Sequence, residues 1–217
     1  MTLALFDLDN TLLSGDSDYE WGRFLVRKKL VDETSYEAEN QRFFGQYQAG
    51  TLDILEYSAF SFGPLSERSM EELAELHSEF MASVIQPLMS DAALQLVEKH
   101  RSQGHTLVII TATNSFITRP IADAFGIPHL LATEPKVVDG RYTREVEGIP
   151  CFQHGKVTRL QQWLENRHET LAGSHFYSDS RNDLPLLEMV ENPVVVNPDN
   201  TLQAVAQERG WPVISLR

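Results

Sequence analysis

The sequence predicts an α/β fold: a three-layer, doubly wound parallel-sheet core into which an all-helical cap is inserted. In the second part of the chain, β-rich runs alternate with stretches of helical periodicity, which is typical of βαβ units with helices on both faces of a sheet. In the first part, one buried strand at 2–7 is followed by helical spacing alone. The simplest division is a core of residues 1–13 and 89–217 and a helical cap of residues 14–88.

The helical segment has an apolar face and a clear helix start. Trp21, Phe24 and Leu25 recur at helical spacing, so they indicate one buried face. Ser69 and Glu72 form the pattern of a capping box, in which each side chain satisfies a backbone amide of the first turn. A second helix is therefore predicted to begin after Ser69.

The later elements have their own boundary signals. Ser90 caps a helix that ends at Gly104, and Asp199 caps the last helix. Asp139-Gly140 between apolar residues predicts a β-hairpin. The remaining elements follow from the alternation of β-rich and helical runs: strands at 106–111, 129–133, 175–179 and 194–196, and helices at 115–125, 156–167 and 183–190.

Composition limits the classes of partner. The chain has 217 residues, of which 42% are hydrophobic, enough for a substantial core. Its 31 acidic and 18 basic residues give a net charge of −13, which repels nucleic acid and anionic membranes, so we expect neither as a partner. A site for anions in so acidic a chain needs a metal ion or a few placed basic groups.

Three further observations predict a cytoplasmic protein. Cys151 is the single cysteine and has no internal disulfide partner, which fits a reducing compartment. The first residues lack a basic region and are interpreted as a strand, not as a signal peptide. No apolar run approaches the ~18 residues of a membrane span. Nothing in the sequence requires an oligomer.

Four short motifs follow predicted strands or begin helices. The first is Asp7-Leu8-Asp9-Asn10-Thr11, placed directly after the first strand, where ligands of parallel sheets bind. An isolated Asp-x-Asp is often only a turn or a helix cap, but its position after a buried strand favours a function. The others are Thr111-Ala112-Thr113, Gly155-Lys156 and the segment from Asp179 to Asp183.

Each of these three motifs also has an ordinary structural interpretation. Threonine and aspartate commonly cap helices, and a lysine on a helix is usually solvated. Taken together, however, two acidic clusters that end two strands of one sheet predict oxygen ligands for a hard cation. Mg²⁺ is the expected ion, because it binds through few carboxylates, water and substrate phosphate.

The four motifs in this order resemble those of the haloacid dehalogenase (HAD) superfamily, whose cores are described as Rossmannoid. The resemblance extends over the whole chain and points to the subfamily with a helical cap between the first two motifs, which includes phosphoserine phosphatases and HAD-type histidinol-phosphate phosphatases. It implies a Mg²⁺-dependent phosphatase that acts on a small phosphate monoester through an aspartyl-phosphate.

The resemblance also implies roles for individual residues. Asp7 would be the nucleophile, Asp9 the general acid and base, and Lys156 the group that pairs with Asp7 and the phosphate. Asp7, the carbonyl of Asp9 and Asp179 would bind the metal, while Asp183 would act through bound water. The residues implied to bind phosphate are Asn10, Thr111, Ala112 and Asn182.

Two positions bear on specificity. In phosphoserine phosphatases an acidic residue after the first motif binds the substrate amine, and Asp16 stands at that position here. The arginine that binds the substrate carboxylate in those enzymes is matched by Ser61, and residues 43–67 contain no arginine or lysine. This difference favours histidinol phosphate, an amine without a carboxylate. Five aromatic residues have two interpretations: they stack on the imidazole of the substrate, or they form part of the cap core. They are Tyr19, Trp21, Tyr57, Phe60 and Phe62.

Several alternatives remain. Within the phosphatases, phosphoserine or a broader set of small metabolites could be the substrate, and a phosphomutase would share the same intermediate. Outside enzymes, a phospho-accepting receiver domain also uses acidic residues on a doubly wound sheet, but receivers lack a large helical insert. A catalytically inactive binding module is disfavoured because all four motifs hold competent residues.

Overall fold

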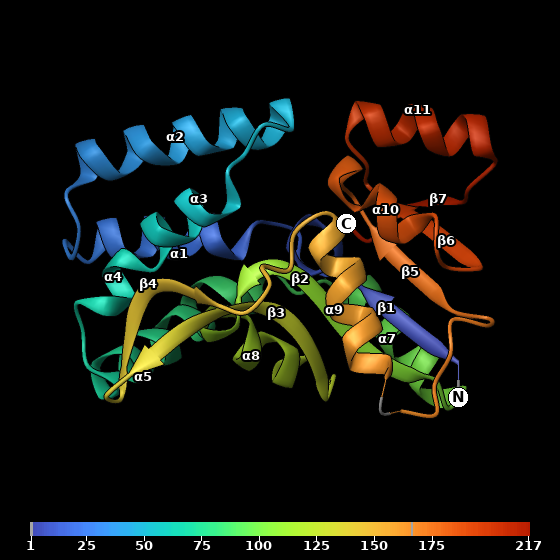
Figure 1. Cartoon of the computed structure of the whole chain (residues 1–217), viewed down its shortest axis with the longest axis horizontal. Coiled ribbons are helices and arrows are strands. Elements are labelled where there is room, and N and C mark those ends of the chain that lie inside the picture. Colours follow the sequence, from blue (N-terminus) through green and yellow to red (C-terminus); the bar gives the residue numbers. More distant parts are fainter. Residues whose placement is uncertain (1, 166) are drawn as a thin grey trace.

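The computed structural model describes residues 2–165 and 167–217 and shows a mixed, mainly parallel sheet crossed by helices on both sides (Figure 1). The seven strands lie in the order β4-β3-β2-β1-β5-β6-β7, and only β3 and β4 pair antiparallel. The strands are β1 (Leu3–Phe6), β2 (Thr106–Asn114), β3 (His129–Val138), β4 (Arg141–Glu147), β5 (His175–Ser178), β6 (Asn192–Val196) and β7 (Val213–Ile214). The predicted fold class is confirmed.

The alternation of side chains along β1 divides the core into two layers. Ala4 and Phe6 belong to the cluster that includes apolar side chains of α7 (Asp91–Ser102) and α8 (Ser115–Ala124). Leu3 and Leu5 point to the other face, because successive side chains of a strand alternate. That face is covered by α9 (His154–Leu164), α10 (Leu184–Leu187) and α11 (Asn200–Arg209).

The segment between β1 and α7 is helical. Its helices are α1 (Ser17–Arg27), α2 (Glu33–Ala49), α3 (Ile54–Ser61), α4 (Gly63–Ser66), α5 (Met70–Phe80) and α6 (Gln86–Leu88), with a wider helical turn at Met81–Ile85. The Ser69–Glu72 capping box is present at the start of α5. Leu13 and Met89 pair as an antiparallel bridge, so the chain leaves the sheet region and returns to it at one point. The division into core and cap domains stays a prediction.

Helices α1 and α5 pack into the same apolar core as the sheet. Trp21 of α1 and Phe80 of α5 contact each other edge-to-face, and Trp21 also meets Phe116 of α8. These side chains belong to the same apolar cluster as Phe6 of the sheet. Burial of such large side chains stabilises the fold by roughly 2–3 kcal/mol each, so α1 and α5 are held firmly against the sheet. None of the helices in the described ranges has both the length and the apolar character needed to cross a membrane.

The structure differs from the predicted elements mainly at their ends. The Asp139-Gly140 turn joins β3 to β4 as predicted, with both residues at positive φ. The helix expected at 183–190 is reduced to a 3₁₀ turn at Arg181–Asp183 followed by α10. Strand β7 was not predicted, because two residues after a proline carry too little periodicity to be recognised.

Candidate active site

The first and fourth motifs meet at one edge of the sheet. Asp7 follows β1 and Asp179 follows β5, and these two strands are parallel neighbours. The backbone amide of Asp7 donates to the carbonyl of Tyr177 at 2.9 Å, which ties the two strand ends together. A cavity of about 560 Å³ opens at this edge, and Asp7, Asp9 and Lys156 are among its lining residues.

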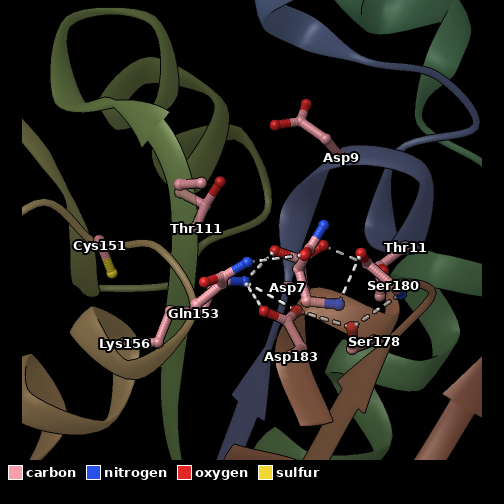
Figure 2. A network of polar contacts seen from close by, with 12 residues as sticks. Asp7, Asp9, Thr11, Thr111, Cys151, Gln153, Lys156, Ser178, Ser180 and Asp183 are labelled. Carbon is pink, nitrogen blue, oxygen red and sulfur yellow. Dashed lines mark hydrogen bonds and ion pairs between the residues drawn. The ribbon is translucent and has the colours of Figure 1, made fainter. Parts of the chain in front are cut away.

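Lys156 forms the centre of a buried polar network (Figure 2). Its ammonium donates to Asp7 Oδ1 at 2.8 Å and lies 2.8 Å from the Asp183 carboxylate, and the Lys156 side chain is only 4% exposed. Burial lowers the pKa of Lys156, but the charges of Asp183 and Asp7 outweigh it and raise the pKa above its usual range. The lysine is therefore a permanent cation. Ser178 Oγ donates to Asp183 at 2.7 Å and holds that carboxylate in place.

The start of α9 brings Lys156 into the site. Gln153 precedes the helix with φ of 48°, and Gly155 lies so close to the chain before it that an added Cβ would stand 2.0 Å from the Pro150 carbonyl oxygen. Only glycine permits this approach. The Gly155-Lys156 pair is thus a geometric unit, and the lysine is not solvated as the alternative interpretation required.

Asp7 and Asp179 converge as ligands of one cation would. Thr11 Oγ1 lies 3.3 Å from Asp7 Oδ2 and 3.1 Å from Asp179 Oδ1, so both carboxylates approach one hydroxyl. Burial is the main cause that raises the pKa of Asp179 well above its usual range, and the charge of Asp7 adds to it. Burial likewise raises the pKa of Asp7 to about 7, against the lowering effect of Lys156. The single positive charge of Lys156 does not balance the carboxylates gathered here. The oxygen atoms of Asp7 and Asp179 therefore fit a hard cation such as Mg²⁺.

Asp9 lies on the same loop as Asp7 but outside the lysine network (Figure 2). Its carboxylate accepts from the backbone amide of Ser17 at 2.6 Å and from Thr113 Oγ1 at 2.7 Å. Burial raises the pKa of Asp9 to about 6, and the neighbouring charge of Asp16 raises it further. A carboxyl group with this pKa exchanges a proton near neutral pH, which suits general acid–base chemistry.

The residues implied to bind phosphate all line the cavity, but their polar groups differ in availability. Asn182 accepts from Gln153 at 3.0 Å, while its Nδ2 is buried and has no hydrogen-bond partner among the described residues. Thr111 Oγ1 accepts from the Thr113 amide at 3.2 Å. The backbone amide of Asn10 is already engaged with the carbonyl of Gly15. The Asn182 amide is therefore an unpaired donor within the described part of the chain, and Ala112 forms part of the cavity wall.

The opposite wall of the cavity is acidic. Asp16 caps α1 by accepting from the amides of Asp18 and Tyr19. Asp18 accepts from Tyr57 Oη at 2.7 Å and from Ser61 Oγ at 3.0 Å. Burial raises the pKa of both aspartates to about 6. Ser61 does not line the cavity, so the structure places this predicted specificity residue behind Asp18, where it supports that carboxylate.

Sequence reasoning missed most of this wall. The lining residues that were not predicted include Asp18, Glu37, Asn40, Phe43 and Phe44. One signal was available: Glu37, Asn40, Gln41 and Phe44 share one face of α2 at helical spacing. Of the stacking candidates, Tyr19 and Tyr57 line the cavity. Trp21 and Phe62 do not, because they are 1% and 2% exposed in the apolar core.

The end of α2 contacts the fourth motif across the cavity. Tyr47 Oη and Ser180 Oγ are 2.8 Å apart, and Arg181 donates to the carbonyl of Gln48 at 2.6 Å. Arg181 therefore joins the helical segment to the loop after β5. His154, in contrast, is exposed and does not line the cavity.

A mainly parallel α/β sheet, with carboxylates gathered around a buried lysine at its carboxyl edge, is the arrangement that the four motifs predict. The chain belongs to the haloacid dehalogenase-like hydrolases, whose family it matches over residues 4–188. The resemblance inferred from the four motifs is confirmed.

Individual relatives extend this assignment. The chain is 47% identical to a histidinol-phosphatase of Neisseria meningitidis serogroup C (strain 8013), with 99% of each chain covered. It is 29% identical to a phosphoserine phosphatase of Mycobacterium tuberculosis (strain H37Rv), covering 99% of this chain and 70% of that one. The chain is also similar to a protein with unknown function from Bordetella pertussis Tohama I, whose crystal structure is known. The two share 46% sequence identity and a TM-score of 0.93, with 100% of each chain covered.

A substrate-bound phosphoserine phosphatase shares the fold at a TM-score of 0.72 and 17% identity, over 98% of this chain and 92% of that one. Within the family, then, this protein is a phosphoric monoester hydrolase, a phosphatase.

Proposed function

We propose that the protein is a Mg²⁺-dependent histidinol-phosphate phosphatase that works through an aspartyl-phosphate on Asp7. The observation that carries the proposal is the contrast between the two sides of the cavity. One side holds Lys156 beside Asp7, and the other presents Asp16, Asp18 and Glu37. Such a cavity suits a molecule with a phosphate at one end and cationic groups at the other. The histidinol-phosphatase of Neisseria, 47% identical over the full chain, supports this choice.

Asp7 and Asp179 would hold the Mg²⁺, with the Asp9 carbonyl as a further ligand. When bound, the ion would offset the charge of the phosphoryl oxygens that otherwise repel a carboxylate nucleophile. The Asp183 carboxylate accepts hydrogen bonds from Lys156 and Ser178. Its first role would therefore be to position the lysine.

The chemistry assigned to the side chains balances in two steps. An oxygen of Asp7 attacks phosphorus, the bond to the substrate oxygen breaks, and that oxygen takes its electron pair and the proton of Asp9. A water then gives a proton to Asp9 and attacks the phosphorus of the aspartyl-phosphate, which releases phosphate and Asp7. Lys156 and the Asn182 amide hold phosphoryl oxygens throughout. The hydrogen bonds from Ser17 and Thr113 keep Asp9 oriented for both transfers.

The acidic wall selects among amine-bearing phosphates. Lys156 is the single basic residue among the described residues that line the cavity. A phosphoserine carboxylate would lie beside Asp16 and Asp18 with no cation to pair with, which is costly in a buried site. Histidinol phosphate has no carboxylate. Its ammonium would pair with Asp16, and its imidazole would meet Asp18 and the ring of Tyr57.

A comparison of substrates tests the proposal. With Mg²⁺ present, kcat/KM for histidinol phosphate should exceed that for phosphoserine by about tenfold or more, since one unpaired charge costs at least 1–2 kcal/mol. Asp18→Asn should lower kcat/KM for histidinol phosphate by about 10- to 100-fold and leave that for p-nitrophenyl phosphate nearly unchanged.

Glu33→Gln is the matched control, because Glu33 is exposed in the first turn of α2 and does not line the cavity. Its kinetics should equal those of the wild type with every substrate. Equal efficiency of the wild type on histidinol phosphate and phosphoserine would contradict the choice of substrate. It would leave the phosphatase assignment intact.

A further inference from the structure

Three histidines meet at the edge of the sheet opposite the active site. His100 lies in the last turn of α7, His105 directly precedes β2, and His175 is the first residue of β5. One ring nitrogen from each lies within 4.8 Å of the others. The active-site residues follow the carboxyl ends of these parallel strands, whereas this cluster lies at their amino ends. The proposed phosphatase chemistry uses none of the three.

Hydrogen bonds orient the buried ring toward the other two. His100 is 1% exposed, and its Nε2 is 2.8 Å from the hydroxyl of Tyr177. With Nε2–H donating to that hydroxyl, the lone pair of Nδ1 points to His105, whose Nδ1 is 2.8 Å away. A polar partner on the far nitrogen is the arrangement that orients metal-binding histidines. Tyr177 would be that partner.

The third ring contains an unsatisfied nitrogen. Nδ1 of His175 is buried and has no hydrogen-bond partner among the described residues. A buried nitrogen with a free lone pair or proton is costly, and most such groups in proteins are paired. Three imidazoles thus converge, and one of them lacks the hydrogen bond that a purely structural cluster would supply.

The surroundings favour the neutral imidazoles that metal ions require. Burial lowers the pKa of His100 to about 4, with further lowering from His175, His105 and Lys99. Burial also lowers the pKa of His175, and His105 and Lys99 contribute. A lowered pKa favours the neutral ring, and a neutral imidazole has a free ring nitrogen that can bind a metal ion.

We propose that His100, His105 and His175 bind a zinc ion, with water as the fourth ligand. Zn–N bonds of ~2.0–2.1 Å place the nitrogens of a tetrahedral site roughly 3.4 Å apart. The nitrogens here lie between 2.8 and 4.8 Å from one another, so small rotations of the partly exposed His105 and His175 rings complete the geometry. Three imidazoles select zinc over Mg²⁺, which prefers oxygen ligands.

The zinc ion would cross-link segments of the folded chain. It would join the connection between α7 and β2, which carries His100 and His105, to the start of β5, which lies far along the chain. A ligand that binds only the folded state stabilises it, so the expected effect is on stability and not on the phosphatase reaction. The site is independent of the proposed substrate.

Calorimetric titration of the EDTA-treated, dialysed protein with ZnCl₂, in excess MgCl₂ to fill the carboxylate site, tests this inference. The wild type should bind one zinc ion at the histidines, and the same titration followed by NMR should shift the imidazole nitrogens of these three residues. His105→Ala and His175→Ala should each weaken zinc binding by at least tenfold. His168→Ala is the matched control, since His168 is exposed and outside the cluster.

Differential scanning fluorimetry gives the second measurement. Zinc should raise Tm of the wild type and of His168→Ala but not of His105→Ala. The inference is overturned if the Mg²⁺-saturated wild type binds no zinc, or if His105→Ala and His175→Ala bind it as tightly as the wild type. Zinc binding that is lost in Asp179→Asn but retained in both histidine variants would place the ion at the carboxylates and overturn it as well.

Discussion

At the scale of single residues, burial determines what each carboxylate can do. Asp7, Asp9, Asp16 and Asp18 carry the same functional group, yet their hydrogen-bond partners separate them into distinct positions in the site. Asp7 faces a lysine, Asp9 faces an amide and a hydroxyl, and Asp18 faces two hydroxyls. The pKa of each is raised by burial to between about 6 and about 7.

The nucleophile assigned to Asp7 predicts a specific loss. Asp7→Asn should lower phosphate release from histidinol phosphate and from p-nitrophenyl phosphate by several orders of magnitude, because an amide cannot form the acyl-phosphate. Circular dichroism should show an unchanged fold, since Lys156 keeps Asp183 as its partner. Asp91→Asn, an exposed change in the first turn of α7, should retain full activity. A variant at Asp7 with substantial turnover would exclude the covalent route.

The ionised Asp16 carboxylate is predicted to lower the stability of the folded protein at neutral pH, while it serves to bind the substrate amine. Its pKa is raised from 3.8 to about 6, so the folded state binds more protons than the unfolded state between those pH values. Stability contributed by the protonated form is therefore lost as pH rises from about 4 to about 6. Asp16→Asn keeps the helix cap and removes the charge. At pH 7.5 it should stabilise the metal-free protein by on the order of 1–3 kcal/mol while lowering kcat/KM for histidinol phosphate.

Thermal unfolding between pH 4 and pH 7.5 measures this effect, and the gain should shrink as pH falls below about 6. Asp32→Asn is the control, because Asp32 also caps a helix but hydrogen bonds from Ser35 lower its pKa. That variant should give no gain at neutral pH. A gain in Asp16→Asn that did not change with pH would show that charge is not its cause.

At the scale of elements, helix ends bring the reactive groups together. The start of α9 delivers Lys156, the start of α1 delivers Asp16, and the face of α2 supplies the cavity wall. Loops after β1 and β5 supply the carboxylates. The site is thus built from segments that rigid helices and strands hold on both sides, which limits how far each group can move.

The close approach of Gly155 to Pro150 sets the start of α9 and with it the position of Lys156. In Gly155→Ala, the new Cβ would meet the Pro150 carbonyl oxygen at 2.0 Å, and the start of α9 must shift. We expect a loss of about 1–3 kcal/mol of stability from the forced shift. A displacement of about 1 Å in Lys156 should lower kcat by about 100-fold.

Urea unfolding and steady-state kinetics measure the two effects of Gly155→Ala. Gly45→Ala is the matched control, because Gly45 lies within α2 and an added Cβ meets no atom within 4 Å. It should stabilise the protein by roughly 0.5–1 kcal/mol with no kinetic change. Wild-type kcat in Gly155→Ala would show that the start of α9 does not position the lysine.

At the scale of the whole molecule, the charge balance explains why a cation is expected. The chain carries a net charge of −13, and the site concentrates the carboxylates of Asp7, Asp179 and Asp183 around one lysine. Mutual repulsion of these groups lowers the stability of the metal-free protein. A bound Mg²⁺ would relieve it and prepare the site for an anionic substrate.

Metal removal should therefore change activity and stability together. EDTA should abolish phosphate release, and MgCl₂ should restore it and raise Tm of the wild type, because the ion binds only the folded state. Asp179→Asn should remove most of the Mg²⁺-dependent rise in Tm. Full turnover in metal-free buffer would be incompatible with the proposed cofactor, whatever the effect on Tm.

The sequence by itself determined the fold class and the reactive edge of the site. Asp7 and Asp179 could be predicted because each directly follows a strand, and parallel strands end at the same edge of a sheet. Lys156 could be predicted from the order of motifs, although only the structure shows that it is buried between two carboxylates. These signals are local: each is contained within a few consecutive residues.

Only the tertiary structure decided the acidic wall of the cavity and the histidine cluster. Asp18, Glu37 and Tyr57 come from three helices, and His100 and His175 come from a helix and a strand that are far apart in the chain. Their proximity depends on how those elements pack, which helical periodicity does not specify. For the same reason the sequence could match Ser61 to the carboxylate-binding arginine of phosphoserine phosphatases but could not predict its orientation, which places it behind Asp18. Local pattern fixes which elements form, and packing of their apolar faces fixes which polar side chains meet.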